Sequence, residues 1–137
     1  MSVPPHVVDG AELPALAIPL SRAFVVATAI ASRDYQDVHH DPEAAQASGA
    51  SDVFLNILTS NALVERFLRA WAGPAARLTA LRIRLGVPSP AGETVVLTGR
   101  VSRVEGDRAD VEILGTNSAG VHITGEAGLA WPEGSAA

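Results

Sequence analysis

The chain has 137 residues, of which 47% are hydrophobic and 18% charged, and its formal net charge is -5. This length fits one domain, and the apolar content excludes an intrinsically disordered chain. The negative charge and the low aromatic content argue against nucleic acid as the main partner, and the absence of Cys excludes disulfide scaffolds, thiolate nucleophiles and Cys-ligated zinc.

The mean hydropathy of +0.22 is high for a small domain, whose surface is large relative to its core. The N-terminus lacks the basic and apolar regions of a secretory signal, and no run approaches the roughly 18 apolar residues of a membrane span. We therefore expect a cytoplasmic protein without a membrane segment, whose excess apolar surface is covered in an oligomer.

The first third of the chain contains two expected elements and a polar turn. Residues 1–20 contain four prolines and are expected to form an irregular arm. Residues 22–30 (RAFVVATAI) are β-branched and apolar, which predicts a strand. After a polar turn at 32–40, Asp41-Pro42-Glu43 predicts a helix start, because it places an N-cap, a first-turn Pro and a first-turn Glu in order, and Gly49 ends this short helix.

The rest of the chain reads as one long helix followed by strands. Apolar residues at helical spacing predict a helix over 56–72, ended by Gly73-Pro74. Alternating patterns and Gly-containing turns then predict four strands, over 78–87, 93–104, 108–116 and 121–131. We expect these consecutive strands to pair as an antiparallel meander against the long helix, which is an α+β layout.

The segment 33–42 (RDYQDVHHDP) gathers three Asp and two His within eight positions. Read alone, these are capping residues in a solvated turn. A metal site is disfavoured, because adjacent His39 and His40 point in different directions from a regular backbone and the chain has no Cys. Acid–base chemistry needs a carboxylate and an imidazole that converge on one water, and Asp34 and His39 converge only if Asp34 precedes a helical turn that carries His39.

Residues 33–39 resemble the signature of MaoC-like (R)-specific enoyl-CoA hydratases, Gly-Asp-x-Asn-Pro-(Ile/Leu)-His, which precedes a helix start like DPEAA at 41–45. The similarity continues through the long helix and a turn at 90–94 (PAGET). It implies a hot-dog fold, in which an antiparallel sheet wraps a long central helix. The expected organisation is an N-terminal arm at 1–20, one hot-dog domain at 21–132 and a C-terminal tail at 133–137.

The chain departs from the family pattern at Gln36 and Asp37, where the signature has Asn and Pro, and at 55–57 (LNI), where it has His-Gly-Met. These departures, together with WAGP at 71–74 and RLGVP at 84–88, resemble one branch of the family. That branch is the small catalytic subunit of the heteromeric hydratase of steroid side-chain degradation.

The resemblance implies hydration of a 2-enoyl-CoA thioester, with Asp34 as the base and His39 orienting the water. It assigns stabilisation of the thioester oxyanion to the main-chain N–H of Asn56, at the start of the long helix. It also implies substrate contacts by Gln36, Val38, Leu55 and Ile57. No cofactor or metal is expected, because CoA is part of the substrate.

The resemblance further implies a steroid substrate with a three-carbon side chain and a larger MaoC-like partner subunit that completes a heterotetramer. Two alternatives stay open. One is a hot-dog acyl-CoA thioesterase, which would release free CoA. The other is a non-catalytic hot-dog subunit, in which Asp34 and His39 are turn and capping residues.

Other polar residues have simpler interpretations. Glu65 lies nine residues beyond Asn56, about 13 Å along a helix, which favours a surface or interface role. Arg82 and Arg84 share one strand face and read as solvated charge, with CoA phosphates as the alternative. Structural or supporting roles are expected for His6, His40 and His122.

Overall fold

A computed structural model describes residues 3–133, so most of the expected tail at 133–137 lies outside the described residues. Five strands and four helical segments follow one another in this part of the chain. They are β1 (Glu12–Pro19), α1 (Arg22–Ala31), the 3-10 turn η1 (Asp37–His39), α2 (Pro42–Ala47), α3 (Ile57–Ala72), β2 (Arg77–Leu85), β3 (Thr94–Glu105), β4 (Arg108–Asn117) and β5 (Gly120–Ala130).

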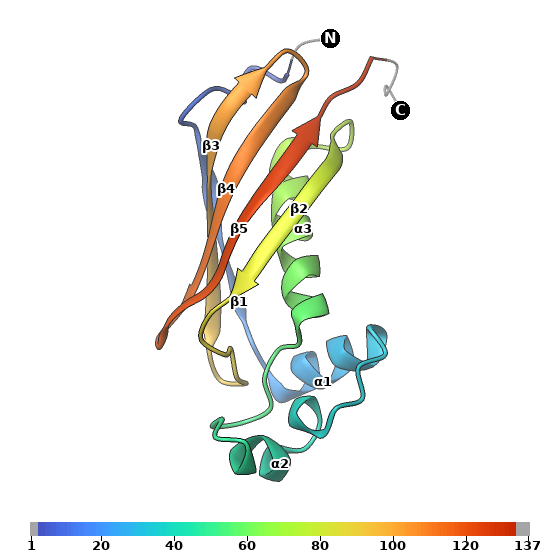
Figure 1. Cartoon of the computed structure of the whole chain (residues 1–137), viewed down its shortest axis with the longest axis vertical. Helices are drawn as coiled ribbons and strands as arrows, with labels where there is room; N and C mark the ends of the chain where they lie inside the picture. The colour runs from blue at the N-terminus through green and yellow to red at the C-terminus, as the bar shows by residue number, and fades with distance from the viewer. Residues whose placement is uncertain (1–2, 134–137) are drawn as a thin grey trace.

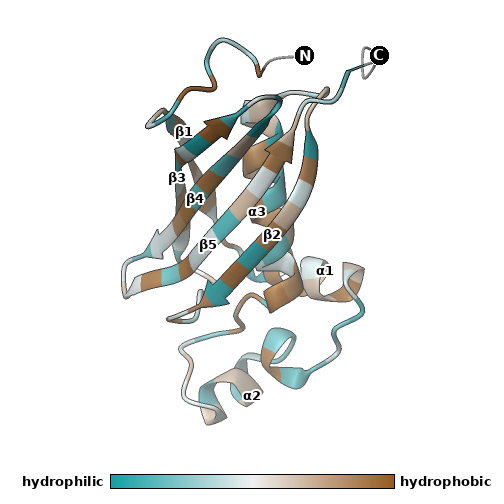
Figure 2. Ribbon diagram, turned by 45° about the horizontal axis from the view of Figure 1, so that its top comes forward, coloured by the Kyte–Doolittle hydropathy of each residue, from teal (hydrophilic) through white to brown (hydrophobic). Residues whose placement is uncertain are grey.

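The five strands form one antiparallel sheet in the order β1-β3-β4-β5-β2, and α3 lies lengthwise against one face of it (Figure 1). Inward and outward side chains alternate along the central strands, most regularly in β4, and Figure 2 shows this as alternating brown and teal bands. The expected α+β layout of one long helix on an antiparallel sheet is confirmed.

The core lies between α3 and the concave face of the sheet. Leu63, Val64, Phe67 and Leu68 of α3 are buried there, at the i, i+3 and i+4 spacing of one helix face. Gly99 of β3 lets the helix approach, because a Cβ at this position would lie 3.1 Å from the Phe67 ring. The predicted helix at 56–72 is therefore confirmed, with Asn56 as its N-cap and Gly73 as its C-cap.

The strand predicted over 22–30 is wrong, because this segment forms α1. Ser21 caps the helix by accepting a hydrogen bond from the Phe24 N–H at 3.0 Å. Val25 and Ala29, four residues apart, are its buried side chains. Packing of this face and the Ser cap outweigh the β-branched composition on which the strand prediction rested.

Two predictions about the sheet are also wrong. The irregular arm expected over 1–20 ends early, because Glu12–Pro19 form the edge strand β1 on β3. The last four strands do not form one meander, since β2 pairs with β5 instead of β3. β2 is an edge strand, whereas β3 lies next to the opposite edge, so the connection between them spans the width of the sheet. This connection contains Pro88 and Pro90, which have no N–H to donate to a neighbouring strand.

The predicted short helix at Asp41-Pro42-Glu43 is confirmed as α2, with the Asp41 carboxylate accepting from the Glu43 N–H at 2.9 Å. α1, η1 and α2 gather at one end of the molecule, beside the N-terminus of α3 (Figure 1). The polar segment 32–41 is thereby brought to the start of the long helix. Over residues 3–133, no helix has the length and hydropathy needed to cross a membrane.

Candidate active site

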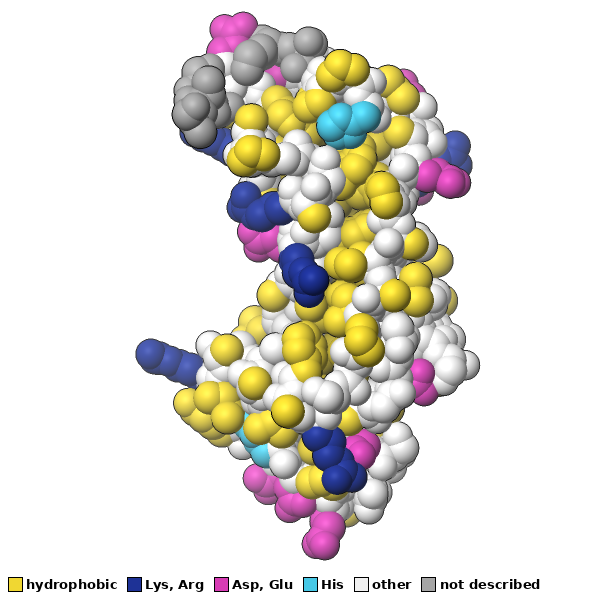
Figure 3. All heavy atoms as spheres, turned by 180° about the vertical axis from the view of Figure 1, so that it is seen from behind, with side chains coloured by type: hydrophobic (Ala, Val, Ile, Leu, Met, Phe, Trp, Pro, Cys, Tyr) yellow, Lys and Arg dark blue, Asp and Glu magenta, His cyan; other side chains and the backbone are white. Residues whose placement is uncertain are grey.

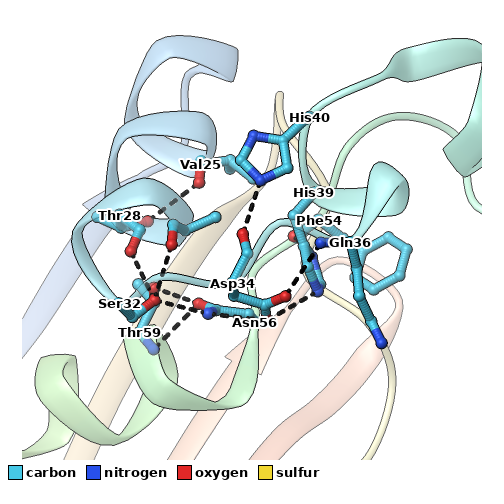
Figure 4. Close-up of polar contacts among 11 residues, drawn as sticks. Val25, Thr28, Ser32, Asp34, Gln36, His39, His40, Phe54, Asn56 and Thr59 are labelled. Atoms are coloured by element: carbon cyan, nitrogen blue, oxygen red, sulfur yellow. Dashed lines mark hydrogen bonds and ion pairs between the residues drawn. The ribbon is translucent and has the colours of Figure 1, made fainter.

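The segment that carries Asp34 leaves α1 through a strained turn. Arg33 has φ 55°, the left-handed conformation that a non-Gly residue rarely adopts. The turn is held by main-chain hydrogen bonds from Arg33 N to Ile30 O and from Asp34 N to Ala29 O, both 2.9 Å. It reverses the chain so that the Asp34 side chain points towards the N-terminus of α3 (Figure 4).

Asp34 and His39 converge. Asp34 precedes η1 and His39 is the last residue of that turn, which is the arrangement that their spacing requires. Nε2 of His39 lies 3.4 Å from Oδ2 of Asp34, and the two side chains are 6% and 23% exposed. A half-sequestered carboxylate and imidazole therefore face one another at a distance that one water molecule can bridge.

The segment before α3 fixes the tautomer of His39. Nδ1 of His39 lies 2.7 Å from the main-chain oxygen of Phe54. Because a carbonyl oxygen can only accept a hydrogen bond, Nδ1 carries the proton. The Phe54 ring also packs edge-on against the imidazole, with ring centroids 5.0 Å apart. In neutral His39, Nε2 and the Asp34 carboxylate are then neighbouring acceptors, and a molecule that lies beside both can donate one hydrogen bond to each.

The side chain of Asn56 joins the Asp34 carboxylate to α3. Its amide nitrogen donates to Asp34 Oδ2 at 3.1 Å and to the Ser32 hydroxyl at 2.8 Å. Its carbonyl oxygen accepts from the N–H of Thr59 at 3.1 Å and from the Thr59 hydroxyl. All polar atoms of this buried amide are engaged (Figure 4). The carboxylate is therefore held by a network anchored in the first turn of the long helix.

The same contacts keep the carboxylate ionised. Burial raises the pKa of the Asp34 carboxyl, but hydrogen bonds from the Asn56 amide and the Gln36 N–H lower it. The neighbouring imidazoles of His39 and His40 lower it further, and the net pKa is below its ordinary value. The imidazole of His40 bonds to the main-chain oxygen of Asp34 at 2.7 Å, which is the supporting role expected for it.

The start of α3 offers main-chain donors beside this pair. Asn56 is the N-cap, so its own N–H and those of the first helical residues have no carbonyl partner within the helix. Thr59 is satisfied by the Asn56 side chain, whereas no partner for the Asn56 N–H is found among residues 3–133. The helix dipole adds positive potential here, so the site favours an anionic oxygen.

The residues predicted to contact substrate are dispersed. Gln36 is exposed at the start of η1 and Val38 is half-buried within it. Ile57 is 50% exposed on the first turn of α3. Leu55 is 3% exposed and belongs to the hydrophobic core, which leaves its side chain almost no surface for a ligand.

Sequence reasoning assigned Asn56 a main-chain role only and missed its side chain, together with Ser32, Thr59 and the Phe54 carbonyl. One signal was present, since Asn56, Thr59 and Ser60 are polar residues at the otherwise apolar start of a helix. Ser60 has a different partner, because its hydroxyl donates to Nε2 of the buried His122 at 3.0 Å.

The remaining candidates lie outside this cluster. The Glu65 side chain is partly exposed and pairs with Arg69 at 2.7 Å, consistent with its expected surface role. Arg82 and Arg84 are exposed on β2, and Arg82 lies in register with Glu126 of β5. His122 is structural as expected, with Nδ1 donating to Val87 O at 2.7 Å. Within residues 3–133, no cluster of three or more His, Asp or Glu is placed to hold a metal ion.

No protein-family model matches the chain. It is 45% identical over 117 residues to the 3-oxo-4,17-pregnadiene-20-carboxyl-CoA hydratase beta subunit of Mycobacterium tuberculosis, covering 85% of this chain and 91% of that protein. Among solved structures, a chain of the ChsH1-ChsH2 complex from Mycobacterium tuberculosis superimposes with a TM-score of 0.88 at 43% identity, over 91% of this chain and 98% of that one.

The fold is shared more widely. The (R)-hydratase from A. caviae involved in PHA biosynthesis superimposes with a TM-score of 0.85 at 20% identity, over 94% of this chain and the whole of that one. The expected hot-dog fold is confirmed by these likenesses.

Proposed function

Because the chain belongs to the family of MaoC-like (R)-specific enoyl-CoA hydratases, we propose that it adds water across the 2,3 double bond of a CoA thioester through Asp34 and His39. One observation carries the proposal. The Phe54 carbonyl holds His39 in the tautomer whose free lone pair faces the Asp34 carboxylate at 3.4 Å, so the two acceptors together select and orient one water.

In the proposed reaction the water donates one hydrogen bond to Asp34 and one to Nε2 of His39. Its free lone pair then points away from both and attacks C3 of the enoyl group. Asp34, ionised at neutral pH, accepts one proton of the water as the C3–O bond forms, and the electron pair of the double bond moves towards the thioester as an enolate. The proton then passes from Asp34 to Nε2 of His39, 3.4 Å away, and His39 delivers it to C2 as the enolate collapses. The sum is addition of one H and one OH across the double bond, with no change in redox state and no cofactor beyond the CoA of the substrate.

Charge that develops on the thioester oxygen during this reaction needs preorganised donors. The main-chain N–H of Asn56 is the proposed one, because it lies at the positive end of α3 and is unused among the described residues. Since this donor is main chain, Asn at a position where the family has Gly keeps it. Asn56 adopts φ -83°, which any residue reaches without strain.

The proposed substrate is a steroid with a three-carbon side chain activated as a CoA thioester. The relative named above is a hydratase of 3-oxo-4,17-pregnadiene-20-carboxyl-CoA, and it shares 45% identity with this chain. In a compound of that name the alkene carbon β to the thioester is itself a member of the steroid five-membered ring. Water would therefore be added to a ring carbon and give a tertiary alcohol.

We also propose a larger MaoC-like partner subunit, and a heterotetramer built from the two. The related chain was solved as part of a two-protein complex. Seen from behind, the face that carries α3 has a continuous band of apolar side chains (Figure 3), and Ile57 and Leu58 of its first turn are about half exposed. A partner that covers this band would account for the high hydropathy. A cytoplasmic location is proposed as well, because a CoA thioester carries phosphate charges that do not cross a bilayer.

The test is hydration of a panel of enoyl-CoA thioesters, steroidal and straight-chain, by the chain purified with its partner. Asp34→Asn and His39→Ala are each expected to lower kcat by about 100-fold or more, the usual contribution of a positioned acid–base group. Asp37→Asn and His6→Ala are matched controls, since both residues lie outside the cluster and should leave the rate unchanged. Folded Asp34→Asn and His39→Ala variants with full activity would contradict the mechanism, and CoA release without a new hydroxyl would identify a thioesterase.

A further inference from the structure

The Phe54 carbonyl that fixes the tautomer of His39 belongs to a short antiparallel bridge. Residues 53–55 lie against residues 89–91 of the β2–β3 connection, with Phe54 opposite Pro90. We call these six residues the Pro90 bridge. Two main-chain hydrogen bonds close it, from Leu55 N to Ser89 O at 3.0 Å and from Ala91 N to Val53 O at 2.8 Å.

The Pro90 bridge leaves the carbonyl of Phe54 free for His39. Its two hydrogen bonds are made by the neighbours of Phe54 and Pro90, so these two residues form a non-hydrogen-bonded pair. In such a pair, the main-chain N–H and C=O of each residue point away from the other strand. The Phe54 oxygen is thereby turned towards Nδ1 of His39, 2.7 Å away, and Pro90 fits because its missing N–H is not needed here. The position of residues 89–91 therefore determines where this oxygen lies.

Asn117, at the end of β4, holds the Pro90 bridge from its other side. Its amide nitrogen donates to Pro88 O and to the hydroxyl of Ser89, both at 2.9 Å. Its carbonyl oxygen accepts from the N–H of Ala119 at 2.9 Å. Ser89 is fully buried, and its main-chain oxygen is the acceptor for Leu55. One side chain of the β4–β5 turn thus fastens the β2–β3 connection at the residue where the bridge begins.

We propose that Asn117 is a positioning residue for His39. The proposal rests on the proposed function, in which Nε2 of His39 accepts a hydrogen bond from the water and later the proton. Asn117 orders the connection, the Pro90 bridge aims Phe54 O, and this oxygen keeps the imidazole proton on Nδ1. Without the oxygen, the favoured site of the proton is Nε2, which then donates to the Asp34 carboxylate 3.4 Å away and no longer accepts from the water.

The test is Asn117→Asp in the chain purified with any subunit that co-purifies. Aspartate keeps the acceptor for the Ala119 N–H, so the β4–β5 turn is retained, but it lacks the amide donors and its charge repels Pro88 O. NMR of the ring nitrogens in the histidine-labelled chain reports the tautomer, with His39→Ala to assign the signal. The variant is expected to move the His39 proton from Nδ1 to Nε2. It should also lower kcat about 10-fold or more with unchanged KM, because Asn117 orients a reacting side chain and contacts no substrate.

Ser102→Ala is the matched control, because this exposed hydroxyl donates to Asp110 O at 3.2 Å elsewhere in the sheet. It should change neither the tautomer nor kcat. Ser89→Ala is a second variant, which removes one acceptor of the Asn117 amide without touching the turn and should act in the same direction.

Two results would overturn the proposal. One is a folded Asn117→Asp variant, or a Ser89→Ala variant where the first does not fold, whose His39 keeps its proton on Nδ1. The other is an equal loss of kcat in Ser102→Ala. Failure of the proposed function is distinguishable, because the tautomer is measured without substrate and would still respond to Asn117 in a protein that hydrates no thioester.

Discussion

The side-chain amide of Asn56 donates a hydrogen bond to the Asp34 carboxylate across 3.1 Å, and the same side chain caps α3. One residue therefore orders the start of the long helix and holds the charge of the proposed base. These two functions can be separated by experiment, because a cap acts on stability alone whereas a donor to the base acts on the pH dependence of the rate.

Replacement of Asn56 by Ala should move the acid limb of the pH–rate profile. The amide lowers the pKa of Asp34, so its removal raises that pKa, and the base becomes protonated at a higher pH than in the unmodified protein. The acid limb of kcat/KM is expected to shift to higher pH, and the variant should lose about 1 kcal/mol of stability with the cap. Ser48→Ala at the end of α2 is a control without contact to Asp34. If the variant lost stability but the acid limb did not shift, Asn56 would act only as a helix cap and not as a donor that tunes Asp34.

His122 should make the fold sensitive to mild acid. Burial lowers the pKa of this imidazole, which accepts a hydrogen bond from Ser60 and donates one to Val87 O. Below the ordinary value of 6.5 the unfolded chain then binds a proton that the native protein excludes, so stability falls as pH drops below that value. Tm measured between pH 7.5 and pH 5.5 should fall more for the unmodified protein than for His122→Gln. Parallel pH dependences in the two proteins would contradict this assignment.

The left-handed conformation of Arg33 predicts that this position tolerates Gly better than Val. Arg33→Gly should fold with unchanged stability or a small gain, because Gly adopts φ 55° without steric cost. Arg33→Val should lose about 1–2 kcal/mol, since a β-branched side chain is most strained there, and should also lower activity by displacing Asp34. Arg84→Val on the exposed face of β2 controls for the change of side chain. Denaturant unfolding checks all three variants, and equal stability of Arg33→Gly and Arg33→Val would show that the turn is not strained.

The elements that could be predicted from the sequence are those whose structure depends on residues close to one another in the chain. The Asp-Pro-Glu start of α2, the apolar period of α3 and the alternation of the last three strands each come from neighbouring residues, and each matched the structure. The segment at 22–30 failed because its composition favours a strand, while the Ser21 cap and the burial of Val25 and Ala29 stabilise a helix. Strand order failed for β2 because pairing partners are set by packing around α3, which leaves no trace in the local pattern.

At the site, the spacing of Asp34 and His39 permitted convergence without requiring it. The contacts that bring them together come from residues distant in sequence: Phe54 O on the imidazole and Asn56 on the carboxylate. The tautomer of His39 depends on a main-chain oxygen, which has no residue identity to recognise in a sequence. For that reason the family resemblance identified the pair, whereas the network that orients it emerged only from the fold.

The acid–base pair lies within six consecutive residues, 34–39, at one end of the sheet, whereas the groups that orient it, Phe54 O and the Asn56 side chain, belong to the segment before α3 and to its N-cap. The reacting groups and the groups that hold them are thus encoded in two stretches of the chain that meet only in the folded protein. A substitution in either stretch can therefore disable the reaction while the other stretch keeps its sequence. A sequence comparison confined to residues 34–39 would therefore miss half of the site.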